Sequence, residues 1–233
     1  MTRNIALLLA GGRGTRFSSM RPKQYIEVDG QPVIAYTMSR FNSHPMVTDI
    51  YVVCSPEWRE YMEILAKEKG FEKFRKCIPS GETSFLSVRS GIEGLLAEGI
   101  DECAMVMVHD AVRPLVSHDI ITNNILTCSE HGNAITVVYS NESYMRVSGG
   151  NSATGYAMRE EYMRAQTPHT FKLSVLRDLM AETDRCGVTY SQSLFTLVCE
   201  LNYCPLYIAQ GDIINFKITQ PQDLKYFRAL KDV

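Results

Sequence analysis

The sequence of 233 residues lacks the features of several large protein classes. It has no excess of positive charge, because 24 Lys and Arg are set against 26 Asp and Glu, and the net charge is −2. Proteins that bind nucleic acid generally depend on a basic excess, so we expect no nucleic-acid partner. No repeat or low-complexity tract is present, and 45% of the residues are hydrophobic, which is typical of a globular chain. No apolar run approaches the roughly 20 residues that cross a bilayer, so we expect no membrane partner either.

The seven cysteines form no recognisable disulfide or metal framework. Their number is odd, none are spaced as CxxC, and the interval between Cys199 and Cys204 matches no usual zinc site. Cys54 and Cys103 lie in apolar runs, where a thiol acts as a small core hydrophobe. The first residues contain one Arg and a short apolar run that ends in glycines, which indicates a buried strand rather than a signal peptide. We therefore expect a cytoplasmic protein.

Short apolar runs alternate with amphipathic segments along the chain, which predicts an α/β fold of βαβ units with a mostly parallel sheet flanked by helices. The length favours one domain over residues 1–233. Ligands of such sheets bind beyond the carboxyl ends of the strands, here the loops after residues 10, 79 and 108. We expect strands over residues 5–10, 49–54, 76–79, 104–108, 134–139, 206–210 and 214–218, and helices over 32–41, 56–69 with Ser55 as N-cap, 84–96, 118–130, 173–186, 191–201 and from Pro221.

The chain changes character between residues 139 and 162. Residues 144–159 indicate short strands around the turn sequence SGGN at 148–151. The stretch is too polar for a central core. It fits an arm that packs against a partner subunit, and it equally fits a surface hairpin without a function.

The strongest motif is a glycine-rich loop that follows the first strand. Residues 9–16 are LAGGRGTR, and Pro22-Lys23-Gln24 comes shortly after. Gly11, Gly12 and Gly14 let the backbone approach a bulky anion, and Arg16 and Lys23 add cationic donors for phosphate oxygens. The spacing fits neither a P-loop, which ends in Gly-Lys-Ser/Thr, nor GxGxxG, because Arg16 occupies the third small position.

Two further segments follow predicted strands. In HDAVRP, residues 109–114, Asp110 is placed to hold Mg²⁺ or a ribose hydroxyl, although Arg113 could simply pair with it. His109 fits a packed residue at a strand end better than a base. In PSGET, residues 79–83, with Ser87 in the next helix, small residues could read the edge of a base, or could simply begin a helix.

Four motifs in order resemble the polyol-phosphate cytidylyltransferases: AGGRGTR with PKQ, HDAVRP, RAQTPHTF and NFKITQPQDL. This group comprises the 2-C-methyl-D-erythritol 4-phosphate (MEP) cytidylyltransferases of isoprenoid synthesis and the ribitol-5-phosphate cytidylyltransferases of teichoic-acid and capsule synthesis. The likeness covers nearly the whole chain. It implies a CTP-dependent nucleotidyltransferase with a Rossmann-like fold, and a homodimer in which the arm at 139–162 reaches over the partner.

The resemblance also implies roles for individual residues. The glycine loop with the catalytic cations Arg16 and Lys23 would hold the triphosphate of CTP. The second substrate's phosphate would lie on Ser143, Arg159, Thr167 and Lys217, of which Arg159 and Lys217 would also be catalytic, and Asp110 would help to place Mg²⁺. The nucleotide would contact Leu9, Ala10, Gly11, Gly12, Gly14, Gly81, Glu82, Ser87, Asp110 and Ala111, with cytosine read by Gly81, Glu82 and Ser87.

The sequence departs from the family pattern at two places. Ser84 stands where these enzymes usually carry Arg, and Thr189-Tyr190-Ser191 replaces Thr-Asp followed by a small or acidic residue. The second change removes a carboxylate expected near the hydroxyls of the polyol. This change, with the GGxGTR and HDAVRP motifs, puts ribitol 5-phosphate or a related capsule polyol phosphate slightly ahead of MEP.

The implied reaction is an in-line attack of a phosphate oxygen on the α-phosphorus of CTP, with pyrophosphate as the leaving group. Because a phosphate monoester is already ionised near neutral pH, catalysis needs positioning and cations rather than a general base. A nucleotide-binding regulator that has lost activity is an alternative that Ser84 and Tyr190 keep open. A nicotinamide-dependent dehydrogenase would need a small residue in place of Arg16 and an acidic residue after the second strand, and the chain has neither.

Overall fold

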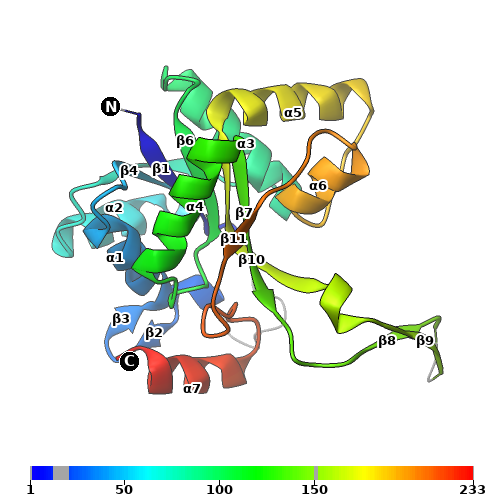
Figure 1. Ribbon diagram of the computed structural model, residues 1–233. Coiled ribbons are helices and arrows are strands. Elements are labelled where there is room, and N and C mark those ends of the chain that lie inside the picture. The colour runs from blue at the N-terminus through cyan, green and yellow to red at the C-terminus, as the bar shows by residue number, and fades with distance from the viewer. Residues whose placement is uncertain (1, 13–20, 150–151, 233) are drawn as a thin grey trace.

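A computed structural model describes residues 2–12, 21–149 and 152–232. These residues form a seven-stranded sheet in the order β11-β7-β10-β6-β1-β4-β5 (Figure 1). Its strands are β1 (Asn4–Leu9), β4 (Asp49–Cys54), β5 (Phe74–Pro79), β6 (Met105–Asp110), β7 (Asn133–Tyr139), β10 (Met163–Lys172) and β11 (Ile208–Gln210). Only β10 runs antiparallel to its neighbours in this sheet, so the predicted mostly parallel α/β architecture is confirmed.

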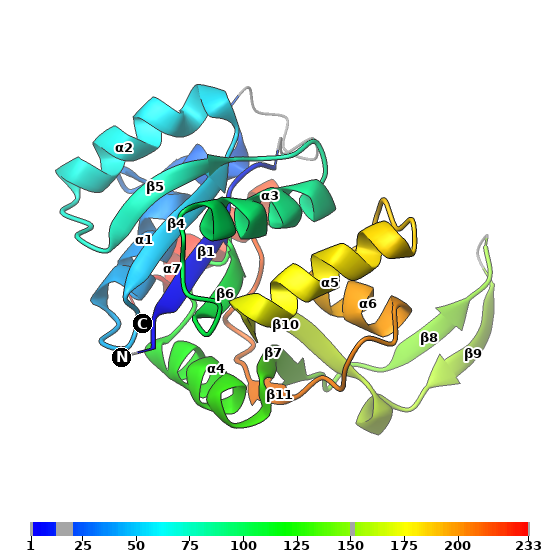
Figure 2. The same cartoon turned by 90° about the horizontal axis from the view of Figure 1, so that it is seen from above.

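Helices cover both faces of the sheet. Alternate side chains of β1 point to opposite faces, and Leu8 packs with α1 (Val33–Ser43), α2 (Arg59–Glu68) and α4 (His118–His131). Leu7 packs on the other face with α3 (Ser84–Ala97), α5 (Leu173–Arg185) and α6 (Leu194–Glu200). Burial on both faces explains why β1 has the unbroken apolar run that predicted it. Figure 2 shows α5 and α6 side by side at the end of the molecule that carries the arm.

A third apolar cluster closes the end of the molecule below the carboxyl ends of the strands. It joins the small hairpin β2 (Glu27–Val28) and β3 (Gln31–Pro32) to α7 (Pro221–Leu230) through Val28, Ile218 and Phe227. In Figure 1 this hairpin and α7 lie together at the bottom of the view. Among the described residues, no helix is long and apolar enough to cross a membrane.

The order of the strands creates a crevice at the ends of β1 and β6. From β1 the chain moves outward to β4 and β5, and it then returns to place β6 on the other side of β1. In open α/β sheets such a reversal leaves a gap between the two loops that follow the central strands, and ligands bind there. The loops after Leu9 and Asp110 flank this gap.

The predicted hairpin protrudes from the body. Strands β8 (Tyr144–Val147) and β9 (Ala153–Ala157) pair only with each other in the described chain and project away from the sheet (Figure 1). The side chains of Met145 and Tyr156 are 73% and 75% exposed. A short 3₁₀ turn, η3 (Arg159–Glu161), leads from the hairpin back to β10.

Two expectations about secondary structure were wrong. Residues 214–218 form a turn and an extended segment rather than a strand, because no neighbouring strand pairs with their backbone. The side chain of Ser55 makes no capping hydrogen bond, and a 3₁₀ turn, η2 (Pro56–Trp58), precedes α2. Strand β10 and the β2–β3 hairpin were not expected. The motif RAQTPHTF lies inside β10, whose register against β7 shifts between Ala165 and His169.

Candidate active site

The carboxyl ends of β1 and β6 open into a cavity of about 730 Å³. This volume is within the range of small-molecule sites. Its lining comes from the glycine loop, a 3₁₀ turn η1 (Lys23–Tyr25), the start of α3, the end of β6, the register shift of β10, the segment before α6, and the segment before α7. The polar lining residues include Lys23, Gln24, Glu82, Ser84, Ser87, Asp110, Arg113, Gln166, Thr167, His169, Ser191, Gln192, Ser193, Lys217 and Thr219.

The described part of the glycine loop is held by a buried glutamine. The amide of Gln24 donates hydrogen bonds to the carbonyl oxygens of Ala10 (2.5 Å) and Gly12 (3.0 Å). Gly11 lies so close to the next loop that a Cβ there would be 2.4 Å from the Cβ of Ser80. A larger residue at Gly11 would therefore separate the two loops that form this wall of the cavity. Lys23 precedes Gln24 on the same turn, so the turn places a lysine beside the loop.

The start of α3 lies beside the glycine loop and continues this wall. The Thr83 hydroxyl caps the helix by accepting a hydrogen bond from the backbone N–H of Leu86 (3.1 Å). The Ser87 hydroxyl donates to the carbonyl of Gly81 (3.2 Å), which ties the loop to the helix. A Cβ on Gly81 would lie 2.4 Å from the Cβ of Leu86, so glycine is needed for this tight entry. The turn thus exposes backbone of Gly81 and Glu82 to the cavity.

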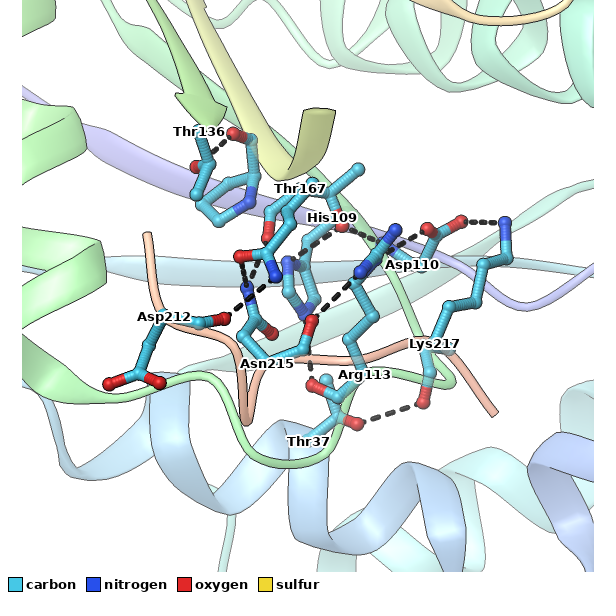
Figure 3. A network of polar contacts seen from close by, with 12 residues as sticks. Thr37, His109, Asp110, Arg113, Thr136, Thr167, Asp212, Asn215 and Lys217 are labelled. Carbon is cyan, nitrogen blue, oxygen red and sulfur yellow. Dashed lines mark hydrogen bonds and ion pairs between the residues drawn. The ribbon is translucent and has the colours of Figure 1, made fainter. Parts of the chain in front are cut away.

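Asp110 is at the centre of a cationic cluster at the end of β6 (Figure 3). Lys217 Nζ is 2.8 Å from Oδ1 of Asp110, and Arg113 Nε is 3.0 Å from Oδ2. Burial alone raises the pKa of Asp110, but the charges of Lys217 and Arg113 outweigh burial and hold its pKa well below the usual range. The carboxylate is therefore ionised, and the cluster of two cations and one anion carries a net positive charge.

Two buried histidines border this cluster and stay neutral. Burial lowers the pKa of His109 to about 3 and that of His169 to about 4. His109 Nε2 is 3.2 Å from the carbonyl of Arg113, which can only accept, so Nε2 carries the proton. Its Nδ1 then accepts from the hydroxyl of Thr167 (3.2 Å), whose oxygen in turn accepts from the backbone N–H of Asp110 (3.1 Å). His109 is thus the packed strand-end residue that the sequence favoured.

Comparison with known proteins assigns the chain to a family. The profile of the IspD family, 2-C-methyl-D-erythritol 4-phosphate cytidylyltransferase, matches residues 4–230. The chain belongs to this family. A ribitol-5-phosphate cytidylyltransferase of Streptococcus agalactiae serotype Ia is 32% identical to it over 230 residues, which cover 98% of this chain and 95% of the relative. An MEP cytidylyltransferase of Clostridium botulinum (strain Langeland) is 27% identical over 224 residues, which cover 96% and 95%.

Solved structures agree with this assignment. The crystal structure of MEP cytidylyltransferase from Thermus thermophilus is 26% identical, covers 100% of both chains and has a TM-score of 0.75. Membership of the IspD family confirms the resemblance that the four motifs carried. It also confirms the Rossmann-like fold class and the expectation of a nucleotidyltransferase of the cytidylyltransferase type.

The structure brings most of the predicted site residues of this IspD family member to one cavity. The predicted residues that line it are Leu9, Gly11, Gly12, Lys23, Gly81, Glu82, Ser87, Asp110, Thr167 and Lys217. Ala10 and Ala111 lie behind the wall, 2% and 0% exposed, and their backbone groups are already bonded: Ala111 N–H to the Leu9 carbonyl, for example. Gly14 and Arg16 are outside the described residues.

Two predicted residues are separated from this cavity. Ser143 and Arg159 lie on the protruding segment, and neither lines the cavity of its own chain. The Arg159 side chain is 58% exposed, and its Nε is 3.2 Å from Oε1 of the adjacent Glu160. Both residues therefore stay predictions that depend on where the arm lies in an assembly.

Three amide residues at or beside the cavity were not singled out from the sequence: Gln24 and Gln166 line it, and Asn215 is buried next to Gln166. Gln24, Gln166 and Asn215 belong to the quoted motifs PKQ, RAQTPHTF and NFKIT, but their side chains were given no role. Neutral amides have no charge or nucleophilicity to single them out. The signal that could have found them is their position one or two residues from Lys23, Thr167 and Lys217.

The two departures from the family pattern meet at the same cavity. Ser84 at the start of α3 and Ser191 before α6 both line it, whereas the Tyr190 side chain is 66% exposed and does not. The Ser191 hydroxyl is engaged with Ser193 and Thr196 in the cap of α6. The cavity wall therefore carries a neutral hydroxyl at Ser84, where the family pattern has Arg, and the position of the usual Asp is the exposed Tyr190, outside the cavity wall.

Proposed function

We propose that the protein transfers CMP from CTP to the phosphate of a polyol phosphate and releases pyrophosphate. The observation that carries this proposal is the single cavity that combines a glycine loop, a lysine turn and the Lys217–Asp110–Arg113 cluster. Both substrates are anions, and a cavity with a net positive wall suits them. Relatives named for cytidylyl transfer to two different polyol phosphates support the reaction class.

CTP would lie along the crevice between the glycine loop and α3. The glycine loop and the Lys23 turn suit the triphosphate, since backbone N–H groups and a cation can converge on its oxygens. The tight Gly81 turn with Ser87 suits the edge of cytosine. Discrimination against other bases would then come from hydrogen bonds to a desolvated base edge.

The transfer itself would be an in-line displacement. An oxygen of the polyol phosphate attacks the α-phosphorus, a new P–O bond forms, and the bond to the β-phosphate bridging oxygen breaks with its electron pair on pyrophosphate. The attacking oxygen is already anionic, so no proton needs to be removed. His109 and His169 are neutral and buried, which agrees with a mechanism that uses no histidine base. Lys217 and Arg113 would bring the second anion close and stabilise the charge that develops.

Mg²⁺ fits this cavity as an ion shared with the nucleotide. Within the described ranges, no three His, Cys, Asp or Glu side chains come together to hold a metal. Asp110 and Glu82 are the carboxylates in the described cavity wall, and Mg²⁺ is commonly held by one or two carboxylates together with substrate phosphates and water. We propose Asp110 as that ligand, where the ion would supply charge neutralisation. Both Asp110 oxygens already contact cations, so the ligand would be shared rather than dedicated.

The second substrate is proposed to be ribitol 5-phosphate or a related polyol phosphate, with MEP as the alternative. The ribitol-5-phosphate relative is 32% identical and the MEP relative 27%. The chain also departs from the usual pattern where Ser84 replaces Arg and Tyr190 replaces Asp. We also propose a homodimer in which the exposed apolar arm contacts a second copy. There, Ser143 and Arg159 of one subunit would join Thr167 and Lys217 of the other around the polyol phosphate.

The test is an assay of pyrophosphate release with CTP, Mg²⁺ and separate polyol phosphates, with the CDP-polyol identified by mass spectrometry. We expect turnover with ribitol 5-phosphate, and little with ATP or GTP in place of CTP. Turnover only with MEP would replace the preferred substrate by the alternative. CTP binding without turnover on any polyol phosphate would favour the alternative of an inactive nucleotide-binding regulator.

A further inference from the structure

The segment that carries Lys217 has little backbone pairing with the sheet. After β11, the N–H of Gly211 bonds to the carbonyl of Val137 (2.8 Å), and the N–H of Ile218 bonds to the carbonyl of Val112 (2.9 Å). Between these two points the described backbone adds one local bond, from Asn215 N–H to the Asp212 carbonyl. A strand would be fixed by a ladder of hydrogen bonds, so this segment needs other contacts to hold Lys217 in place.

Two buried amide side chains, those of Asn215 and Gln166, supply those contacts. Figure 3 shows Asn215 among its polar partners. Asn215 is 0% exposed, and its Nδ2 donates to the Thr167 carbonyl (3.0 Å) and to Gln166 Oε1 (3.2 Å). Gln166, 2% exposed, donates through Nε2 to the Asp212 carbonyl (2.7 Å). The fit is close, since a Cβ on Gly211 would lie 2.6 Å from Gln166 Oε1. These amides join β10 to the segment on both sides of its turn.

Asn215 also reaches the second cation. Its backbone carbonyl accepts a hydrogen bond from Arg113 Nη1 (2.8 Å), while Arg113 Nε contacts Asp110. Lys217, two residues further on, contacts the other oxygen of Asp110. One residue is therefore linked to both cations of the cluster: to Arg113 by a direct bond and to Lys217 by two backbone steps.

We propose that Asn215, together with Gln166, is a positioning residue that holds Lys217 and Arg113 against Asp110 before substrate arrives. A lysine side chain has many rotamers. The Lys217 side chain is 40% exposed, so little packing restricts it, and the position of its backbone decides where the ammonium lies. Cations that stabilise developing charge are effective when they are already in place. The role in catalysis rests on the proposed function, but the positioning of Lys217 does not.

The unpartnered oxygen of Asn215 supports this role. Its Oδ1 is buried without a hydrogen-bond partner in the described structure. A buried unpaired acceptor reduces stability, so folding alone does not account for an asparagine at this place. The two hydrogen bonds that Nδ2 donates, to Gln166 Oε1 and to the Thr167 carbonyl, do account for it.

The test compares Asn215→Ala with Asn124→Ala as a matched control. Asn124 is also 0% exposed, and its Nδ2 also donates twice, to the Ile120 carbonyl and the Thr136 hydroxyl, but it does not line the cavity. Loss of either amide should lower the melting temperature. Gln166→Met is a second variant that keeps the length of the side chain without its amide, in case Asn215→Ala fails to fold.

Two readouts separate positioning from stability. The first is the rate at which an amine-reactive acylating reagent labels Lys217, measured by mass spectrometry against the exposed Lys225 in the same sample. We expect a rise of about fivefold or more in Asn215→Ala and Gln166→Met, and none in Asn124→Ala. The second is turnover, where a misplaced group can cost on the order of 100-fold. We expect kcat to fall by about 10- to 100-fold while the Kd for CTP changes by less than about threefold.

The outcomes are distinct for the two proposals. Unchanged labelling of Lys217 in both variants overturns the positioning role, whatever the activity. Increased labelling with kcat no lower than in Asn124→Ala overturns its part in catalysis. Failure of the unmodified protein to transfer CMP overturns the proposed function, and the labelling contrast still tests the position of Lys217.

Discussion

Lys217 Nζ lies 2.8 Å from Oδ1 of Asp110, although 107 residues separate the two in the sequence. The contact joins the end of β6 to the segment before α7. It keeps a buried carboxylate ionised in a place where burial alone would favour its neutral form. It also places a cation at the gap between the two central loops, where a pair of anionic substrates would have to meet.

Asp110→Asn tests whether this carboxylate takes part in binding Mg²⁺. The amide keeps the shape but loses the charge, so we expect the Mg²⁺ concentration for half-maximal activity to rise by about tenfold or more, since divalent cations prefer charged oxygen ligands. The measurement is a Mg²⁺ titration of pyrophosphate release at saturating CTP. Glu82→Gln, which neutralises the other described carboxylate of the cavity wall, is the control and should leave the Mg²⁺ dependence in place. Equal Mg²⁺ dependence in Asp110→Asn and the unmodified protein would remove Asp110 from the metal site.

Lys23→Ala tests the triphosphate role of the turn that follows the glycine loop. We expect turnover to fall by about 100-fold or more, by analogy with the loss of one preorganised donor to a transition state. The fold should persist, because the buried Gln24 holds the carbonyls of Ala10 and Gly12. Steady-state rates measure the loss of turnover, and a thermal melt checks that the fold persists. The control is Lys225→Ala, which changes an exposed lysine. Near-normal turnover in Lys23→Ala would show that the turn does not hold the triphosphate of CTP.

Gly81→Ala tests the base-reading turn at the start of α3. The new Cβ would collide with the Cβ and backbone of Leu86, so the turn must shift. We expect the Kd for CTP, measured by calorimetry, to rise by about tenfold, the equivalent of losing one or two hydrogen bonds to the base. Gly155→Ala in the arm, where a Cβ meets nothing within 4 Å, is the matched control. If ATP binds the unmodified protein as tightly as CTP does, the turn is not reading cytosine.

The sequence predicted the elements that are buried on both faces and the charged residues that face the cavity. The apolar run of β1 predicts a buried strand, and the glycines after it predict a loop. The acidic residue that follows the apolar run of β6 predicts a carboxylate at the end of that strand. The segment 214–218, which was expected to be a strand, has alternating apolar residues at Ile214, Phe216 and Ile218 but is not one. Ile218 does pack inward, but against Phe227 of α7, and the polar partners of Asn215 are side chains rather than a neighbouring strand.

Other features depend on contacts between distant segments, which periodicity does not encode. The buried pairing of Gln166 with Asn215 spans 49 residues, and neither residue type is typical of a site. Strand β10 contains a proline and several polar residues, yet it is central because β6 and β7 flank it on both sides. The resemblance to a family placed these motifs in the site, and only the three-dimensional arrangement shows what their amides bind.

Asp49 at the start of β4 is expected to make stability depend on pH. Burial raises its pKa, but hydrogen bonds from Arg3, Arg75 and Thr48 outweigh burial and lower the pKa to about 2. A carboxyl whose pKa is lower in the folded than in the unfolded state contributes stability above about pH 4, and loses it as the pH falls towards 2. Since both arginines are partly exposed, we expect Asp49→Asn to lower the free energy of unfolding at pH 7 by about 1–2 kcal/mol.

Urea unfolding from pH 3 to pH 8 measures this effect. The difference between the unmodified protein and Asp49→Asn should be constant above pH 5 and shrink below pH 4. Glu63→Gln removes a carboxylate from the exposed pair with Arg59 and should change stability by less than about 0.5 kcal/mol. A difference for Asp49→Asn that persists unchanged at pH 3 would mean that its packing, not its charge, stabilises the protein.

Arg159 separates catalysis in a dimer from catalysis within one chain. It lies at the base of an arm whose apolar side chains are exposed, and it does not line the cavity of its own chain. If the arm crosses to a partner, Arg159 completes the partner's polyol-phosphate site. An arginine–phosphate contact is bidentate and charge-assisted, so Arg159→Ala should weaken binding of the polyol phosphate and leave the Kd for CTP nearly unchanged.

Mixing Lys23→Ala subunits with Arg159→Ala subunits tests this arrangement directly. With the arm in the partner's site, a mixed dimer has one site with both defects and one with neither, so its activity should recover towards half of the value for the unmodified dimer. With the arm at its own site, every site carries one defect and no activity returns. Subunit exchange is checked by native mass spectrometry of the mixture. If mixed dimers form and no activity returns, residues 144–159 are a surface hairpin, and the polyol-phosphate site must be completed by residues of the same chain.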